Sequence, residues 1–165
     1  MDRRGTEHLS VRVSIAAQTL ELWREGRLVK TYPVSTSKHG AGEVQGSHRT
    51  PRGRHVVRAK IGAGEPENAV FRGRRPTGEI YSAALAKAHP ERDWILTRIL
   101  WLSGTEVGKN RLRQVDTMRR YIYIHGTPDT EPVGAPGSIG CIRMRNRDIV
   151  ELFGLVPAGT PVDIA

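Results

Sequence analysis

A cysteine and a histidine are the residues of this chain whose types and spacing could support covalent chemistry. Cys141 is the only cysteine, and it lies in the glycine-rich stretch GSIGCIRM at residues 137–144. His125 precedes it by 16 residues and ends the apolar run YIYI. The intervening loop holds three prolines, and we expect it to fold back and bring the two side chains together. His125 is then the candidate base for the Cys141 thiol, and the backbone amides of Gly140 and Cys141 are candidate oxyanion donors.

Each of these residues also has a purely structural interpretation. A lone cysteine is more often a small buried apolar side chain than a nucleophile, and a histidine after a β run can be a hydrogen-bonded structural residue. The pair is more informative than either residue alone, because Gly140 leaves the backbone open to close approach beside Cys141. We expect the imidazole, Arg143 and Arg145 to increase the thiolate fraction of a group whose free pKa is about 8.5.

The elements that must position this pair are mostly short strands. Residues 9–34 alternate apolar and polar side chains and turn at residues 24–26, which predicts a β-hairpin. Further strands are expected at residues 54–62, 93–104 (a strand pair or one long bent strand), 121–126 and 158–165. The remaining segments are predicted as a loop at 37–53, irregular chain with a short helix at 62–92, and a loop or short helix at 110–120.

A helix is predicted after the cysteine motif. Asn146 is a good N-cap, Asp148 and Glu151 suit the early turns, and Gly154 can end the helix. With 18 glycines and 10 prolines to form turns, the fold class is mainly β with few short helices. We expect residues 1–165 to form a single domain.

Composition narrows the choice of partners. A formal net charge of +9 favours anionic partners. A nucleic-acid-binding protein is a remote alternative, because only 5% of residues are aromatic and they do not alternate with basic residues. The histidines at positions 39, 48 and 55 lack paired ligand spacing, so neither a metal nor another cofactor is predicted. No signal peptide or membrane span is evident, which predicts a cytoplasmic protein without membrane contact, or a periplasmic one if the sequence is a trimmed mature form.

The stretch IHGT at residues 124–127, followed by GAPGSIGCIRM at 134–144, resembles the signature of the L,D-transpeptidase catalytic domain, the YkuD-like family. That signature is a His-Gly pair, a loop of similar length, then Ser-His-Gly-Cys, a hydrophobic residue and Arg. The segments at 18–37 and 50–57 match the family's strand pair and its Thr-Pro-x-Gly element, so the resemblance covers residues 10–164. It implies a β-sandwich or barrel of mixed strands with a C-terminal helix after the cysteine loop.

The resemblance also implies roles for individual residues. Cys141 is the nucleophile, His125 accepts and returns the proton, and the amides of Gly140 and Cys141 hold the oxyanion. Residues assigned to substrate binding are Arg143 (a carboxylate anchor or a structural salt bridge), Ser138 (which shapes the loop) and Gly126. The chain departs from the family at Ile139, where histidine is usual. Since backbone carbonyls orient the catalytic imidazole in the family, we expect the chemistry to persist with a drier and narrower site.

The family acts on peptidoglycan stem peptides, so the resemblance implies attack at the L-centre of meso-diaminopimelate and release of D-alanine. Without an export signal, the chain resembles short family members, for which an L,D-carboxypeptidase acting on tetrapeptides or muropeptides in wall recycling is implied. A transpeptidase that forms cross-links or exchanges D-amino acids is the alternative. Carbapenems are expected to acylate Cys141.

Three further segments have open interpretations. The basic runs at residues 71–76 and 109–114 could attract the substrate's carboxylates or form a solvated face. Residues 62–92 could form a lid over the site or a passive surface loop. The oligomeric state is not predicted.

Overall fold

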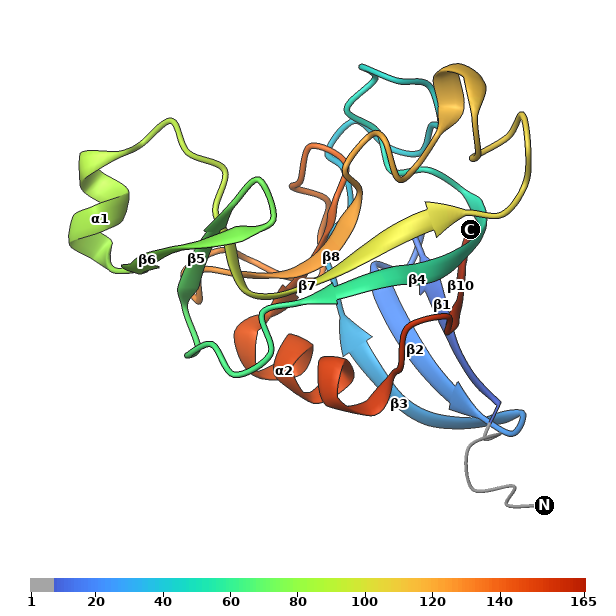
Figure 1. Cartoon of the computed structure of the whole chain (residues 1–165), viewed down its shortest axis with the longest axis horizontal. Coiled ribbons are helices and arrows are strands. Elements are labelled where there is room, and N and C mark those ends of the chain that lie inside the picture. Colours follow the sequence, from blue (N-terminus) through green and yellow to red (C-terminus); the bar gives the residue numbers. More distant parts are fainter. Residues whose placement is uncertain (1–7) are drawn as a thin grey trace.

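The computed structural model describes residues 8–165 and is built mainly from β-strands (Figure 1). These form one mixed sheet of β1 (Leu9–Ser14), β2 (Thr19–Arg24), β3 (Arg27–Pro33), β4 (Gly53–Ile61), β5 (Ala69–Arg72), β6 (Arg75–Ile80), β7 (Ile95–Gly104), β8 (Tyr123–Thr127), β9 (Ile142–Arg145) and β10 (Pro161–Ile164). The helices are α1 (Ala83–Ala88), α2 (Asn146–Leu155) and the 3-10 turn η1 (Arg113–Val115). The prediction of a mainly β fold with few short helices is confirmed.

The sheet curls into a half-barrel. Its strand order is β3-β2-β1-β10-β4-β7, with β5 and β6 continuing from the β4 edge of β7, and β8 and β9 from its other edge. The pairs β1–β10 and β8–β9 are parallel, and the other pairs are antiparallel. Just after β3, Ser35 exchanges two backbone hydrogen bonds of 2.9 Å with Arg143 of β9. The two ends of the curled sheet therefore meet beside the cysteine motif.

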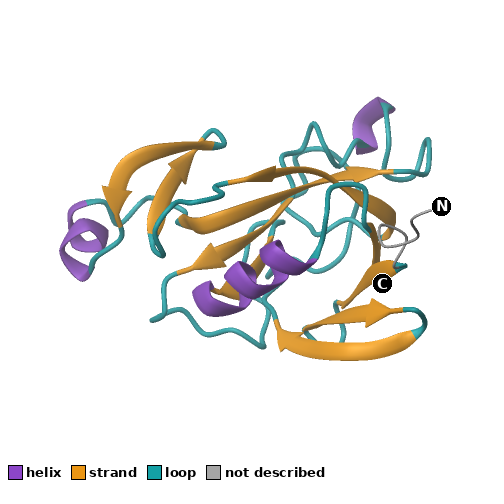
Figure 2. Cartoon of the chain, turned by 60° about the horizontal axis from the view of Figure 1, so that its bottom comes forward, coloured by secondary structure: helices purple, strands orange, loops and turns teal. Residues whose placement is uncertain are grey.

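Two apolar clusters hold the fold together. The larger one lies between the curled strands and α2, and it includes Ile149, Leu152 and Phe153 of this helix. Helix α2 lies beside these strands (Figure 2). The smaller cluster joins Phe71 and Tyr123 with buried neighbours on the outer side of β7 and β8. Cys141 is a partly buried member of this second cluster.

The segment at residues 62–92 is more ordered than its sequence suggested. Strands β5 and β6 form a hairpin there, followed by α1, so the prediction of irregular chain was wrong for residues 69–80. The hairpin turns at Gly73 and Arg74, which both have positive φ. Strand β6 is mostly exposed, so the apolar alternation that marks a half-buried strand is missing from its sequence.

Helix α2 begins and ends differently from the prediction. Arg145 is its N-cap and makes no side-chain cap bond, while Asn146 is the first helical residue. The buried Asn146 side chain instead accepts a hydrogen bond from Thr97 Oγ1 at 2.7 Å. The helix continues past Gly154 to Leu155. Tertiary hydrogen bonding has thus replaced the local cap that the sequence indicated.

Within residues 8–165, no helix has both the length and the apolar character needed to cross a membrane. Residues 1–7 lie outside the described part of the chain. The single-domain organisation of residues 1–165 and the cytoplasmic location stay predictions.

Candidate active site

Strands β8 and β9 place Cys141 and His125 on one face of the sheet. Ile124 of β8 lies opposite Ile142 of β9, and both belong to the larger core cluster. Side chains alternate along a strand, so residues next to these isoleucines point to the opposite face. Cys141 accordingly packs in the smaller cluster with Tyr123, and His125 is on the Tyr123 face. The structure therefore brings the predicted nucleophile and base to the same side of one parallel strand pair.

The Cys141 thiol is half-buried and bonded to backbone groups. Its Sγ accepts a hydrogen bond from the Tyr123 amide at 3.3 Å and donates one to the Tyr121 carbonyl at 3.4 Å. Burial raises the pKa of the thiol to about 12, although the Tyr123 amide acts in the opposite direction. The thiol is therefore protonated at neutral pH. The expectation of an enriched thiolate was wrong, because desolvation outweighs the favourable charges.

Charged neighbours also shift the pKa of this thiol, but they do not cancel the increase caused by burial. Arg143 and Arg120 lower the pKa of Cys141, whereas Asp93 raises it. Arg145, which we expected to join this positive field, is exposed and lines a separate cavity. The arginine that replaces it, Arg120, comes from the segment before β8.

His125 is fully buried and is held by its own backbone neighbour. Its Nδ1 lies 2.6 Å from the Gly126 carbonyl oxygen, and a carbonyl can only accept, so Nδ1 carries the proton. Burial lowers the pKa of the imidazole, although Asp93 and the Gly126 carbonyl oppose this. Nε2 is buried and has no hydrogen-bond partner within residues 8–165. The imidazole is thus neutral, with an unused acceptor nitrogen.

The expected hydrogen bond between the thiol and the imidazole is not formed within the described residues. The Cys141 hydrogen is directed at the Tyr121 carbonyl, and His125 Nε2 has no partner there. Catalytic hydrogen bonds are often loose in ligand-free sites and tighten when substrate binds.

Gly126 supports the imidazole from behind. A Cβ at this position would overlap the Asn146 side chain and the Leu96 carbonyl, so the close packing here requires glycine. The family resemblance implies a substrate-binding role for Gly126. In the structure its contacts are those of a positioning residue, because its carbonyl fixes the tautomer of His125.

The loop before β9 is held by its own hydrogen bonds. Ser138 is buried, and its Oγ donates to the Cys141 carbonyl and accepts from the Gly140 amide at 3.2 Å. The Gly140 carbonyl accepts from Thr50 Oγ1 at 2.9 Å, and Gly140 adopts a φ of +133° that favours glycine. Since the Gly140 amide is engaged by Ser138, the Cys141 amide is the better candidate of the two predicted oxyanion donors.

Arg143 forms a salt bridge. Its Nη2 lies 2.7 Å from Asp93 Oδ1, and its Nη1 donates to the Gly137 carbonyl at 3.1 Å. Of the two roles considered for Arg143, this arrangement is the structural ion pair. The guanidinium still faces the site, because Arg143 lies opposite His125 in the strand pair.

An aromatic group beside the thiol was missed from the sequence. Arg74, from the β5–β6 turn, places its guanidinium carbon 4.7 Å from the Trp101 ring centre and 4.8 Å from that of Tyr121. It also donates to Tyr123 Oη at 3.2 Å. Both tyrosines contact Cys141 Sγ through their backbone, so the 62–92 segment reaches the edge of the site. The alternation of Tyr121, Tyr123 and His125 was the available signal.

Asp93 and Arg120 were also missed, and no local pattern marks them. Asp93 meets its arginine partner across 50 residues of sequence. Arg120 donates to the carbonyls of Gly42 and Arg49, and thereby ties the 37–53 loop to the site. Such hydrogen bonds join residues that are 50 or more positions apart, and only the curled sheet brings them together.

Comparisons with known proteins identify the family of this chain. Residues 9–164 match the family described as the L,D-transpeptidase catalytic domain, YkuD. The protein named "Putative L,D-transpeptidase YkuD" from Bacillus licheniformis is 30% identical over 154 residues, and that from Bacillus subtilis is 29% identical. Both alignments cover 93% of this chain, which spans 64% of the length of these relatives.

Solved structures show the same fold. The L,D-transpeptidase LdtMt1 in complex with imipenem matches with a TM-score of 0.58 and 22% identity, over 96% of this chain and 59% of that one. L,D-transpeptidase 3 from Mycobacterium tuberculosis matches with a TM-score of 0.59 and 17% identity, over 96% and 61%. With the family match over nearly all of the described residues, this chain belongs to the YkuD family of L,D-transpeptidase catalytic domains.

Proposed function

We propose that this protein is a cysteine-dependent enzyme that cleaves peptidoglycan stem peptides at the bond between the L-centre of meso-diaminopimelate and D-alanine. One observation carries the proposal. In a chain of this family, Cys141 and His125 lie on the same face of β8–β9, and the imidazole has a buried, unused Nε2 within the described residues. A thiol on the same strand-pair face as an acceptor nitrogen is the arrangement expected of a nucleophile and its general base.

The electrostatics support general-base catalysis by a neutral pair. Burial keeps Cys141 protonated and His125 neutral, so the proton moves from Sγ to Nε2 as sulfur attacks the carbonyl carbon. The Cys141 amide stabilises the oxyanion. Collapse breaks the C–N bond, and the imidazolium gives its proton to the departing D-alanine amine. Water or an amine then attacks the thioester, loses a proton to Nε2 and releases Cys141.

We propose water as the principal acceptor, which makes the protein an L,D-carboxypeptidase. The supporting observation is that the Arg74 side chain stacks on Trp101 and Tyr121 at the edge of the site. Water needs little room to reach a half-buried thioester, whereas a second stem peptide would compete for the space that these side chains occupy. A conventional transpeptidase with an amine acceptor is the alternative.

Product analysis on a defined tetrapeptide tests the proposal. The protein is incubated with the tetrapeptide, with and without a diamino acceptor, and products are identified by mass spectrometry. We expect tripeptide and free D-alanine in both cases. A cross-linked dimer as the main product would replace the carboxypeptidase with a transpeptidase. The Cys141→Ala variant should be folded and inactive, and full activity in that variant would overturn the nucleophile assignment.

A β-lactam gives an independent probe of the thiol. LdtMt1 has been solved in complex with imipenem, and we propose that a carbapenem acylates Cys141 here. Intact-protein mass spectrometry should show one adduct on the wild-type chain. Acylation of Cys141→Ala to the same extent would contradict the proposal.

A further inference from the structure

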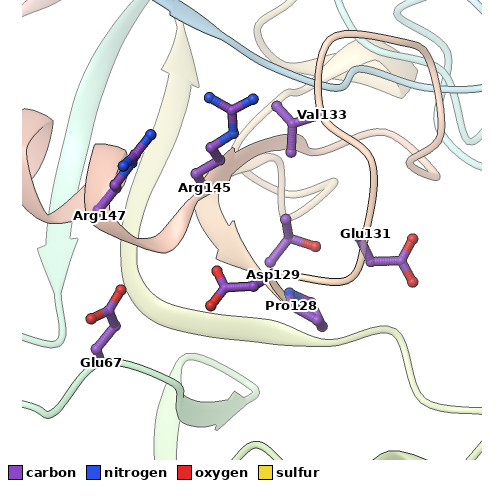
Figure 3. Close-up of a pocket in the computed structure, with 8 residues that line it drawn as sticks. Glu67, Pro128, Asp129, Glu131, Val133, Arg145 and Arg147 are labelled. Atoms are coloured by element: carbon purple, nitrogen blue, oxygen red, sulfur yellow. The ribbon is translucent and has the colours of Figure 1, made fainter. Parts of the chain in front are cut away.

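A cavity lies further along the strands that carry Cys141 and His125. It has a volume of about 310 Å³ and lies between the start of α2, the loop after β8 and the loop before β5 (Figure 3). Arg145 and Arg147 line one side, and Glu67, Asp129, Glu131 and Val133 line the rest. This volume is at the lower end of the range for small-molecule sites.

The charges around this cavity are of both signs and are not neutralised across it. Within residues 8–165, no ion pair joins either arginine to Glu67, Asp129 or Glu131. The contact of Arg147 is with Asp148 of its own helix, at 4.0 Å, and Asp129 accepts a weak bond from Asn146 at 3.4 Å. Both guanidiniums and the Glu67 carboxylate therefore keep hydrogen-bonding capacity for a ligand.

The distribution of charge selects the class of ligand. A simple anion would be attracted by the two arginines but repelled by the three carboxylates. A simple cation would be attracted by the carboxylates but repelled by the arginines. Among residues 8–165, no three acidic, histidine or cysteine side chains are arranged to hold a metal ion. A molecule with one carboxylate and one ammonium group satisfies both sides, because arginine binds carboxylates in a forked geometry and carboxylates accept from ammonium. We infer that this cavity binds the zwitterionic end of an α-amino acid.

The strand register connects this cavity to the proposed active site. His125 lies opposite Arg143, and the next pair on the same face, Thr127 opposite Arg145, lines the cavity. Two residues along a strand correspond to roughly 6.6 Å. A stem peptide bound at Cys141 can therefore extend toward the cavity. This link rests on the function proposed above, whereas binding of a free amino acid does not.

Binding is measured by isothermal titration on the full-length Cys141→Ala protein, so that no turnover intervenes. The probes are D-alanine and meso-diaminopimelate, with N-acetyl-D-alanine and D-alanine amide as analogues that lack one charge. We expect saturable binding of at least one zwitterion. Each analogue should bind about tenfold or more weakly, the loss of one charge-assisted hydrogen bond. Binding of D-alanine identifies a free amino acid as a ligand, and binding of diaminopimelate alone identifies the stem peptide's diamino acid.

Two exposed residues provide matched variants. Arg145→Gln should weaken zwitterion binding and abolish the preference over D-alanine amide, and Glu67→Gln should abolish the preference over N-acetyl-D-alanine. The controls are Arg58→Gln, an exposed arginine of β4, and Glu65→Gln, on the same loop as Glu67 but outside the cavity. They should bind as the parent does. No saturable binding of either zwitterion, or equal binding of the charge-deficient analogues, would overturn the inference. If zwitterions bind but wild-type protein releases no D-alanine, the inference stands and the proposed function fails.

Discussion

The two faces of the β8–β9 strand pair have opposite chemical characters. One face carries Ile124, Ile142 and Met144, which are fully buried in the larger cluster. The other carries His125 and Cys141, whose pKa values are moved by burial in opposite directions. The same two strands thus contribute to both the apolar core and the candidate site, because successive side chains along a strand point to opposite faces. We therefore expect substitutions on the core face to lower the free energy of unfolding, and substitutions on the face of His125 and Cys141 to lower turnover.

The largest expected effect is a loss of turnover when His125 is replaced, compared with a replacement of the second buried histidine, His55. His125→Ala should reduce turnover by about 10² to 10⁴, the typical contribution of a positioned general base. His55 is also buried, but its ring nitrogens contact the Gly53 carbonyl and Thr117 Oγ1, away from the thiol. Steady-state kinetics on tetrapeptide, with His55→Gln as the control, measures the difference. An equal loss of turnover in both variants, at a temperature where both are folded, would remove the distinction.

The opposite face is tested by Ile124→Ala. Removing this fully buried side chain should lower the free energy of unfolding by about 2 to 5 kcal/mol. Because the change is on the core face, turnover below the melting transition should fall far less than in His125→Ala. Urea unfolding and kinetics on the same preparation give both values. A large loss of turnover without a loss of stability would show that the two faces are not separable.

His55 should make stability depend on pH. Burial lowers its folded-state pKa to about 4, from an unfolded value near 6.5, so the unfolded chain binds more protons between these values. The stabilisation is complete above pH 6.5 and is lost as the pH falls toward 4, by about 3 kcal/mol for this one group. Urea unfolding from pH 4 to 7.5 should show this slope, and His55→Gln should have a smaller one. Parallel curves would contradict the assignment.

The smallest predicted effect concerns Asp93. Its carboxylate raises the pKa of Cys141, so Asp93→Asn should move thiol alkylation to lower pH. The carboxylate is about one-third exposed, and the shift should be correspondingly modest. Iodoacetamide labelling as a function of pH, followed by mass spectrometry, measures it, with Glu91→Gln on the same loop as the control. A shift to higher pH in Asp93→Asn would reverse the assigned sign.

Local patterns in the sequence were sufficient for much of the fold. Alternation over residues 9–34 predicted the strands β2 and β3 and the turn between them, and the run at 93–104 proved to be the single long strand β7. The β5–β6 hairpin was missed because β6 is exposed on both sides and shows no alternation. The cap at Asn146 was misplaced because Thr97, far away in sequence, bonds its side chain.

The site was predictable in its residue types and not in its electrostatics. The spacing of Cys141 and His125 pointed to a pair, and the strand register places them on one face. Their protonation states depend on burial and on Asp93, which the fold supplies from another strand connection. No pattern within the cysteine motif could indicate that the Gly140 amide is taken by Ser138.

The meeting of the sheet's two ends has a consequence for engineering this chain. Ser35 bonds to Arg143, Ser37 pairs with Ser138, and Thr50 bonds to Gly140. Three contacts thus run from the first third of the chain to residues 137–144, the stretch that contains Cys141. A chimera that inherits only the histidine and cysteine motifs would lack the backbone that shapes them. The minimal transferable unit includes residues 35–50, however distant they are in the printed sequence.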